Sequence, residues 1–199
     1  MTPKGERRRD ALVSAAAELL YEGGFDAVRH RSVARRAGLP LASTTYYFSS
    51  LDDLVVQAVE HVGDEEAAQL RARMAGLSRR RRSVASTADV LVDLLLGGQS
   101  PARIGEQLIS RYERYVACAR LPVLRDVQRR LRQQRTAAIA EAIGRCGRPV
   151  GGQRLAALVY AIDGALVAAL VEDGTDPRAT ARAALLDVID VLAPMSTRN

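Results

Sequence analysis

The chain has 199 residues, a formal net charge of +6 and a sequence pI of about 9.9. Hydrophobic residues make up 48% and charged residues 26%, which is typical of a globular protein and excludes a disordered chain. Aromatic residues make up only 4%, whereas Ala, Leu, Val and Arg are abundant, and this composition favours helix over sheet. The positive charge suits a polyanionic partner, either nucleic acid or an anionic membrane, but does not indicate a fold.

Cysteine usage and the apolar segments indicate the cellular compartment. Cys118 and Cys146 stand far apart, and neither has a Cys or His neighbour at the spacing of a metal site. The N-terminus carries arginines at 7–9 instead of an apolar signal segment. The most apolar stretch, 155–171, is short for a membrane span and contains Asp163. We therefore expect a cytoplasmic protein with no membrane association, no metal and no other cofactor.

The first expected helix runs from about residue 4 to residue 22. Leu12, Ala16 and Leu19 belong to one apolar helical face, and Gly23-Gly24 is typical of a helix end. The arginines at 7–9 lie at the start of this helix. They are either a solvated terminus or contacts to DNA phosphates.

The stretch from His30 to Phe48 reads HRSVARRAGLPLASTTYYF and contains two short helical patterns. The first pattern breaks at Gly38 and the second begins at Pro40. Two short helices joined by a tight turn that contains glycine are typical of a helix-turn-helix. In that motif the second helix enters the major groove of DNA, while the first crosses the backbone.

The rest of the chain reads as further helices. A long helix begins after Ser50, whose spacing to Asp53 approximates a capping box. The arginines at 79–82 are interpreted as a solvated loop in preference to a nucleic-acid patch. The helix that Pro122 opens is expected to turn four arginines outward: Arg125, Arg129, Arg132 and Arg135. The expected helices beyond residue 50 cover about 51–77, 84–95, 101–115, 122–142, 153–172 and 177–192.

The helix over 155–171 is apolar on nearly every face, and such a helix must be covered on all sides. It could lie at the centre of one bundle or, with the Ala-rich final helix, in a four-helix interface between two protomers. We favour the homodimer. The side chains expected at its interface are Leu155, Val159, Asp163, Leu166, Leu185, Val188 and Leu192.

The sequence contains no recognisable catalytic constellation. His30 and His61 have no companion residues, and the chain has no Gly-rich phosphate loop, no G-x-S-x-G and no H-E-x-x-H motif. Asp52 and Asp53 are explained by helix capping. Asp163, within an apolar helix, is interpreted as a hydrogen-bonded interface residue or a ligand-positioning residue. We expect no enzymatic activity and no catalytic residues.

Residues 7–62 resemble the tetracycline-repressor (TetR) family of bacterial transcription factors. The resemblance rests on Gly24-Phe25, Val33-Ala34, Ala37-Gly38-Leu39, Tyr46-Tyr47-Phe48 and Leu54, in this order and spacing. It implies an all-α protein with an N-terminal three-helix helix-turn-helix domain (1–50) and a C-terminal antiparallel helical bundle for ligand binding and dimerisation (51–199). It further implies a homodimeric repressor that binds a near-palindromic double-stranded DNA operator and releases it when a small-molecule effector binds.

The same resemblance implies which side chains contact DNA. Among them, the arginine guanidinium groups suit guanine edges, and the Ser, Thr and Tyr hydroxyls suit phosphates. The expected contact residues are Arg29, His30, Arg31, Leu41, Ser43, Thr45, Tyr46 and Tyr47. Phe48 is expected to pack in the core. The family commonly has Lys at the start of the long helix, where this chain has Leu51, and Tyr where this chain has Thr45. Since the recognition helix is neutral, we expect the positive charge to come from Arg29, Arg31, Arg35, Arg36 and the N-terminal arginines.

An effector pocket is expected among the C-terminal helices. Its candidate residues are amphipathic side chains suited to a mostly apolar pocket with a few polar anchors: Tyr112, Tyr115, Cys118, Gln128 and Tyr160. Two alternatives remain open. One is a DNA-binding regulator without an effector, either a constitutive repressor or an activator. The other is a helical adaptor that binds protein.

Overall fold

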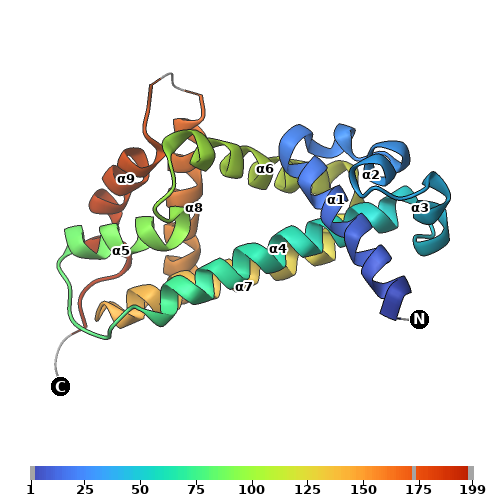
Figure 1. Ribbon diagram of the computed structural model, residues 1–199. Coiled ribbons are helices and arrows are strands. Elements are labelled where there is room, and N and C mark those ends of the chain that lie inside the picture. The colour runs from blue at the N-terminus through green and yellow to red at the C-terminus, as the bar shows by residue number, and fades with distance from the viewer. Residues whose placement is uncertain (1–2, 172–173, 197–199) are drawn as a thin grey trace. The chain divides into compact units, whose positions relative to one another are not determined.

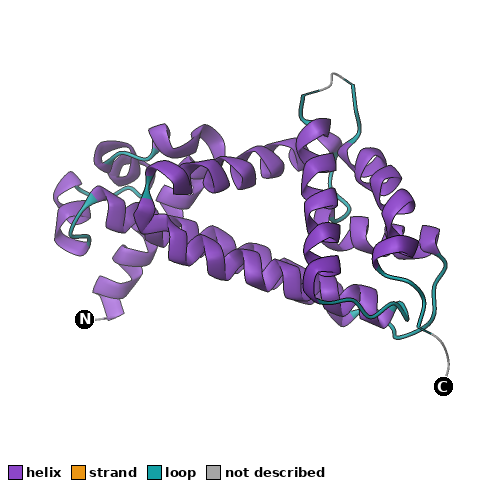
Figure 2. Ribbon diagram, turned by 180° about the vertical axis from the view of Figure 1, so that it is seen from behind, coloured by secondary structure: helices purple, strands orange, loops and turns teal. Residues whose placement is uncertain are grey.

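The computed structural model describes residues 3–171 and 174–196. Over these residues every regular element is helical, and none is a strand (Figures 1 and 2). The helices are α1 (Pro3–Ala27), α2 (His30–Arg36), α3 (Leu41–Tyr47), α4 (Leu51–Ala75), α5 (Val84–Leu96), α6 (Pro101–Arg120), the 3-10 helix η1 (Pro122–Leu124), α7 (Arg125–Arg145), α8 (Gly152–Ala169) and α9 (Pro177–Leu192).

The all-helical fold predicted from composition and periodicity is confirmed. Helix α1 is interrupted where expected, because Gly23 and Gly24 leave helical geometry and Gly24 has φ +64°. The predicted end of α8 at Glu172 lies outside the described residues, and the helix ends at Ala169. None of the helices in the described part of the chain is long and apolar enough to cross a membrane.

Contacts divide the chain into two compact units. The first contains Met1–Glu66 and Ser110–Leu131, and the second contains Ala67–Ile109 and Arg132–Asn199. Helices α4, α6 and α7 therefore contribute residues to both units. The boundary expected at residue 50, between a DNA-binding domain and an effector-binding domain, remains a prediction, because these units are defined by contacts and not by function.

The first unit is built around the apolar face of α1. Leu12, Ala16 and Leu20 are buried there together with Phe48 and Leu54 from later in the chain. This single core carries α2, α3 and the beginning of α4. Fully burying a leucine or phenylalanine side chain stabilises a fold by about 1.5–3 kcal/mol, so the packing on the α1 face contributes strongly to holding the helix-turn-helix.

The second unit packs α9 against both α8 and α5. Two arginines near the start of α9 attach it to α5: Arg178 pairs with Asp93, and the Nε of Arg182 donates to Asp89 at 2.7 Å. Helix α9 begins as the sequence predicted, because the Asp176 carboxylate accepts a hydrogen bond from the Arg178 backbone N–H at 3.0 Å.

The prediction that Arg135 points outward is wrong. Its side chain is buried, and its Nη1 donates to the Asp163 carboxylate of α8 at 2.7 Å. A buried guanidinium needs a charged partner, and the acid on α8 supplies one. Helical spacing alone placed Arg135 with Arg129 and Arg132 on an outer face, since the spacing cannot reveal a charged partner on another helix. Asp163 is thus already engaged within its own chain.

Part of the expected dimer interface is buried inside the protomer. Val159, Leu166 and Leu185 are buried within the chain itself, so they have no surface to offer to a second copy. Leu155, Val188 and Leu192 are half-buried. The outward face of α8 instead presents Tyr160 and Val167, with Val171 just beyond the helix, and α9 presents Val191.

Candidate nucleic-acid interface

Helices α2 and α3 are joined by a tight turn centred on Gly38. Gly38 has φ +64°, a conformation that glycine adopts without the penalty of a Cβ. The backbone N–H of Leu39 donates to the Ala34 carbonyl at 2.9 Å, and that of Gly38 donates to Arg35 at 3.2 Å. Pro40 then caps α3 with φ −59°. The turn has the conformation that the predicted helix-turn-helix requires.

Helix α3 is anchored on its inner side by Thr44 and Phe48. Thr44 is fully buried, and its hydroxyl donates to the Leu41 carbonyl at 2.8 Å. Phe48 is buried in the core of the first unit, as the sequence predicted. These anchors determine which face of α3 points to solvent. The role of Thr44 was missed from the sequence because its neighbours Ser43 and Thr45 have equivalent chemistry.

The outer face of α3 presents hydroxyl and aromatic groups. Leu41 and Thr45 are exposed, Tyr46 is 81% exposed, and Ser43 and Tyr47 are half-buried. The rings of Tyr46 and Tyr47 pack edge to face, with centroids 4.9 Å apart. The structure therefore brings all five predicted α3 residues to one surface or its margin. An exposed tyrosine beside hydroxyl donors can bond phosphate oxygens or base edges.

Four arginines around α2 were expected to supply the positive charge, and they fall into two groups. Arg36 pairs with Glu18 at 3.1 Å and with Glu22 at 2.6 Å, both on α1. Arg29 pairs with Asp26 at 3.1 Å. The expectation that Arg29 and Arg36 supply unpaired positive charge to DNA is therefore wrong, because each already has a carboxylate partner.

Arg31 and Arg35 form the second group. Both are exposed, and neither has an ion-pair partner in residues 3–171 or 174–196. On α2, the positive charge that is available to bind an anion therefore comes from Arg31 and Arg35. His30 lies beside them, half-buried, and its Nδ1 is buried with no hydrogen-bond partner among the described residues.

Arg9, one of the N-terminal arginines, has a structural role. Its guanidinium donates to the side-chain carbonyl of Gln57 on α4, and it lies over the Phe48 ring at 5.6 Å from the centroid. Gln57 in turn donates to Asp53 at 3.1 Å. Arg9 therefore connects α1, the end of α3 and the start of α4. Its neighbours Arg7 and Arg8 are exposed.

Asp53 caps α4 as predicted, with one change of partner. Its backbone N–H bonds the Ser50 hydroxyl at 3.0 Å, but its carboxylate accepts from the Ser49 N–H at 3.0 Å. Burial acts to raise the pKa of Asp53, and the hydrogen bonds from Ser49 and Gln57 with the charge of Arg9 outweigh it, so the pKa is lowered. The ionised carboxylate at the helix N-terminus also suits the helix dipole.

The residues predicted to bind an effector lie on three helices. Tyr112 and Tyr115 are half-buried on α6, and their rings pack edge to face with centroids 5.6 Å apart. The Cys118 thiol donates to the Arg114 carbonyl at 3.1 Å, and burial raises its pKa. Gln128 is buried on α7. Tyr160 is exposed on α8, where Arg132 donates to its hydroxyl at 3.2 Å.

No group of three or more metal-ligating side chains occurs within the described ranges.

Two known protein families match the N-terminal and the C-terminal parts of the chain. Residues 12–58 match the family described as "Bacterial regulatory proteins, tetR family", and residues 82–191 match "Tetracyclin repressor-like, C-terminal domain". Among curated proteins, the HTH-type transcriptional dual regulator CecR of Shigella flexneri is 37% identical over 71 residues. That match covers 36% of this chain and 31% of CecR, about a third of each.

Solved structures resemble nearly the whole chain. The multidrug binding protein EbrR in complex with proflavin is 30% identical, with a TM-score of 0.69, over 92% of this chain and 99% of EbrR. EbrR has also been solved with ethidium, at 29% identity and a TM-score of 0.70. A transcriptional regulator from Rhodococcus sp. RHA1 shares the fold at 22% identity, with a TM-score of 0.71 over 95% of this chain and 99% of its own.

Proposed function

Because this chain belongs to the tetR family of bacterial regulatory proteins and is a transcriptional regulator rather than an enzyme, we propose that it is a homodimeric repressor. In this proposal it binds a near-palindromic operator and releases it when a small molecule binds. The observation that carries the proposal is the surface made by Tyr46, Thr45, Arg31 and Arg35 on the helix-turn-helix. It combines exposed hydroxyls with two guanidinium groups that have no ion-pair partner in the described part of the chain.

The DNA contacts divide between two helices. Helix α3 enters the major groove, where Thr45 and Tyr46 reach base edges and phosphates. Arg35 contacts phosphate, and Arg31 bonds a guanine edge or the adjacent phosphate. Arg29 and Arg36 keep their carboxylate partners and orient α2 against α1, so they contribute little to the salt dependence of binding.

Dimerisation is proposed to use the outward faces of α8 and α9. Exposed apolar side chains gathered on neighbouring helices are typical of an interface. Val171 is 82% exposed and Val191 is 71% exposed, and Tyr160 and Val167 lie on the same exposed face of α8. Leu155, Val188 and Leu192 are half-buried and are proposed to lie at the margin of this interface. Two such helices from each protomer form the four-helix arrangement common in symmetric dimers.

The effector role is supported by relatives of this fold. EbrR is described as a multidrug binding protein and has been solved with proflavin and with ethidium. We infer that this chain also responds to a small molecule. The dimer has one arrangement of its two helix-turn-helix domains that binds DNA and another that does not. An effector that binds the second arrangement more tightly increases the fraction of dimers that cannot bind DNA.

Selection of bound DNA from random oligonucleotides with the purified chain tests the proposal. The expected product is a palindrome whose half-sites are separated by about one helical turn or a multiple of it. An asymmetric site would contradict the dimer. Failure to enrich any sequence, combined with binding that does not weaken as salt is raised, would contradict DNA binding altogether and favour a protein-binding adaptor.

A further inference from the structure

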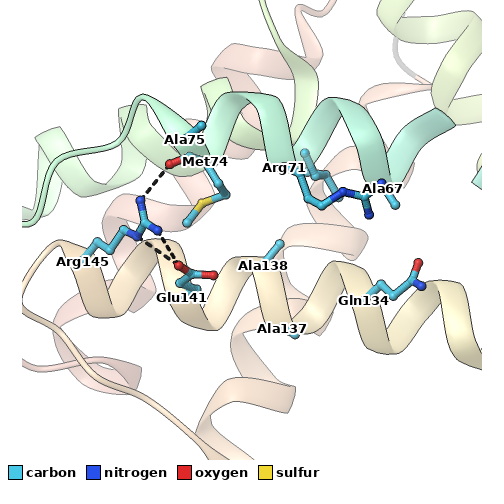
Figure 3. Close-up of a pocket in the computed structure, with 10 residues that line it drawn as sticks. Ala67, Arg71, Met74, Ala75, Gln134, Ala137, Ala138, Glu141 and Arg145 are labelled. Atoms are coloured by element: carbon cyan, nitrogen blue, oxygen red, sulfur yellow. Dashed lines mark hydrogen bonds and ion pairs between the residues drawn. The ribbon is translucent and has the colours of Figure 1, made fainter. Parts of the chain in front are cut away.

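A half-open groove lies between α4 and α7 within the second compact unit (Figure 3). Its volume is about 460 Å³, which is within the range of small-molecule sites. None of the five residues predicted to bind an effector lines it. The groove exists because both facing helices carry alanines there, including Ala67 on α4 and Ala138 on α7, and these short side chains leave the space between the helices unfilled.

The floor of the groove is apolar. Leu70 and Met74 lie one helical turn apart on α4, and both line the groove. Ala138 faces α4 from α7 (Figure 3). Met74 is buried, while Leu70 and Ala138 are half-buried. An alkyl chain laid along this floor would remove the remaining apolar surface from water, which stabilises the complex by about 25 cal/mol per Å² buried.

The charges at the groove are unequal. Arg145 and Glu141 lie together at one end, where the Arg145 Nη2 donates to the Glu141 Oε1 at 2.6 Å. The Arg145 Nη1 also donates to the backbone carbonyls of Met74 at 2.8 Å and Leu77 at 2.9 Å. This arginine is therefore fully engaged, and the charges of the pair cancel.

Arg71 is the remaining charged group of the groove lining. It projects from α4 between the two helices and extends towards Ala67, and it has no ion-pair partner within the described residues (Figure 3). Gln134 on α7 lies at the same end and adds an amide donor. An unpaired guanidinium above an apolar floor is complementary to a carboxylate attached to an alkyl chain.

We propose that the α4–α7 groove binds an amphipathic monocarboxylate, with its carboxylate on Arg71 and its chain along Leu70, Met74 and Ala138. This ligand class has the opposite charge to an organic cation. The regulatory meaning of the site rests on the proposed function, since a ligand can release DNA only from a chain that binds DNA. Binding itself does not depend on that function.

Isothermal titration calorimetry on the full chain with decanoate, below the concentration at which it forms micelles, tests the proposal. Decanoate is expected to bind with one site per chain, and decyltrimethylammonium is expected to bind more weakly. Arg71→Gln is expected to weaken decanoate binding by about threefold to tenfold, because a charge-assisted hydrogen bond at a half-open site is partly screened by solvent. Arg103→Gln on α6 is the matched control, since Arg103 is exposed and outside the groove, and it should leave the affinity unchanged.

Ala138→Leu fills the floor of the groove and is expected to abolish decanoate binding. Ala137→Leu, at an exposed lining position, is also expected to abolish decanoate binding, with less risk to folding. Circular dichroism melting establishes that each variant is folded.

The proposal is overturned if decanoate binds equally well to Arg71→Gln and to both leucine variants, or if decyltrimethylammonium binds more tightly than decanoate. It is also overturned if a folded leucine variant becomes monomeric, because the groove would then be a protomer interface. DNA selection is performed without decanoate, so failure of the repressor proposal is detected separately.

Discussion

The guanidinium of Arg36 donates two hydrogen bonds to the carboxylate of Glu22, at 2.9 Å from Nη1 to Oε1 and at 2.6 Å from Nη2 to Oε2. This bidentate geometry joins the last turn of α2 to α1. Arg36, which was expected to contact DNA, instead orients α2, the helix that carries Arg31 and Arg35. The difference between these arginines lies in their partners and leads to distinct predictions.

The pair makes stability depend on pH. The hydrogen bond from Arg36 holds the pKa of Glu22 below its ordinary value of 4.5. Because the folded-state pKa is the lower one, the stabilisation is complete above pH 4.5 and is lost as the pH falls through the folded-state pKa. We expect Glu22→Gln to lower the melting temperature at neutral pH and to have little effect in acid. Thermal unfolding of both proteins across this range measures the difference, and a difference that is constant with pH would exclude this role.

Arg35 and Arg36 provide a matched comparison for DNA binding. Arg35→Gln is expected to reduce the slope of log K against log salt by about 1, because a phosphate contact is lost. Arg36→Gln removes the same charge but is expected to change the slope much less, since Glu18 and Glu22 already neutralise it. Fluorescence anisotropy titrations of the selected operator at several salt concentrations measure both slopes. Equal slopes for the two variants would contradict the assignment.

Arg31 is expected to read sequence as well as charge. Arg31→Ala should weaken operator binding by about 1–3 kcal/mol and relax the preference at one base position. Arg129→Ala is the control, because Arg129 is exposed on α7 and pairs with Asp126 of the same helix at 2.8 Å. Anisotropy with the operator and its single-base variants gives the comparison. A uniform loss over all sequences would assign Arg31 to phosphate.

Gly24 and Gly38 both have φ +64°, but they differ in their surroundings. A Cβ on Gly38 would meet open space, so Gly38→Ala is expected to cost about 1–2 kcal/mol for the left-handed backbone alone. A Cβ on Gly24 would lie 3.0 Å from the Glu113 Oε2, and its ψ of −164° belongs to a region that is almost exclusive to glycine. Urea unfolding should therefore show a larger loss for Gly24→Ala. A smaller loss at Gly24 than at Gly38 would contradict this account.

The proposed dimer face is tested by placing a charge on it. Val167→Asp on α8 is expected to weaken self-association by about 100-fold or more, because an unpaired carboxylate would be buried between protomers. Val116→Asp on α6 is the control, since Val116 is 64% exposed and lies on a different helix. Sedimentation velocity over a range of protein concentrations distinguishes the two. If Val116→Asp dissociated the dimer and Val167→Asp did not, the dimer interface would be assigned to α6 instead.

The sequence by itself determined the helices and the helix-turn-helix. Apolar spacing on α1, glycine at positions 24 and 38, and the Ser50–Asp53 cap act between residues close in the chain, so local physics is sufficient to predict them. The burial of Phe48 followed from the same pattern. The side of α3 that faces solvent needed the structure, because Ser43, Thr44 and Thr45 have similar chemistry and only packing buries Thr44.

The partners of charged groups were decided by the tertiary structure alone. Arg36 with Glu22, Arg135 with Asp163 and Arg9 with Gln57 join residues 14, 28 and 48 positions apart. Helical periodicity assigns a side chain to a face but does not reveal what lies opposite that face. The α4–α7 groove has the same origin: alanines on two helices distant in sequence leave a space only when those helices are packed side by side.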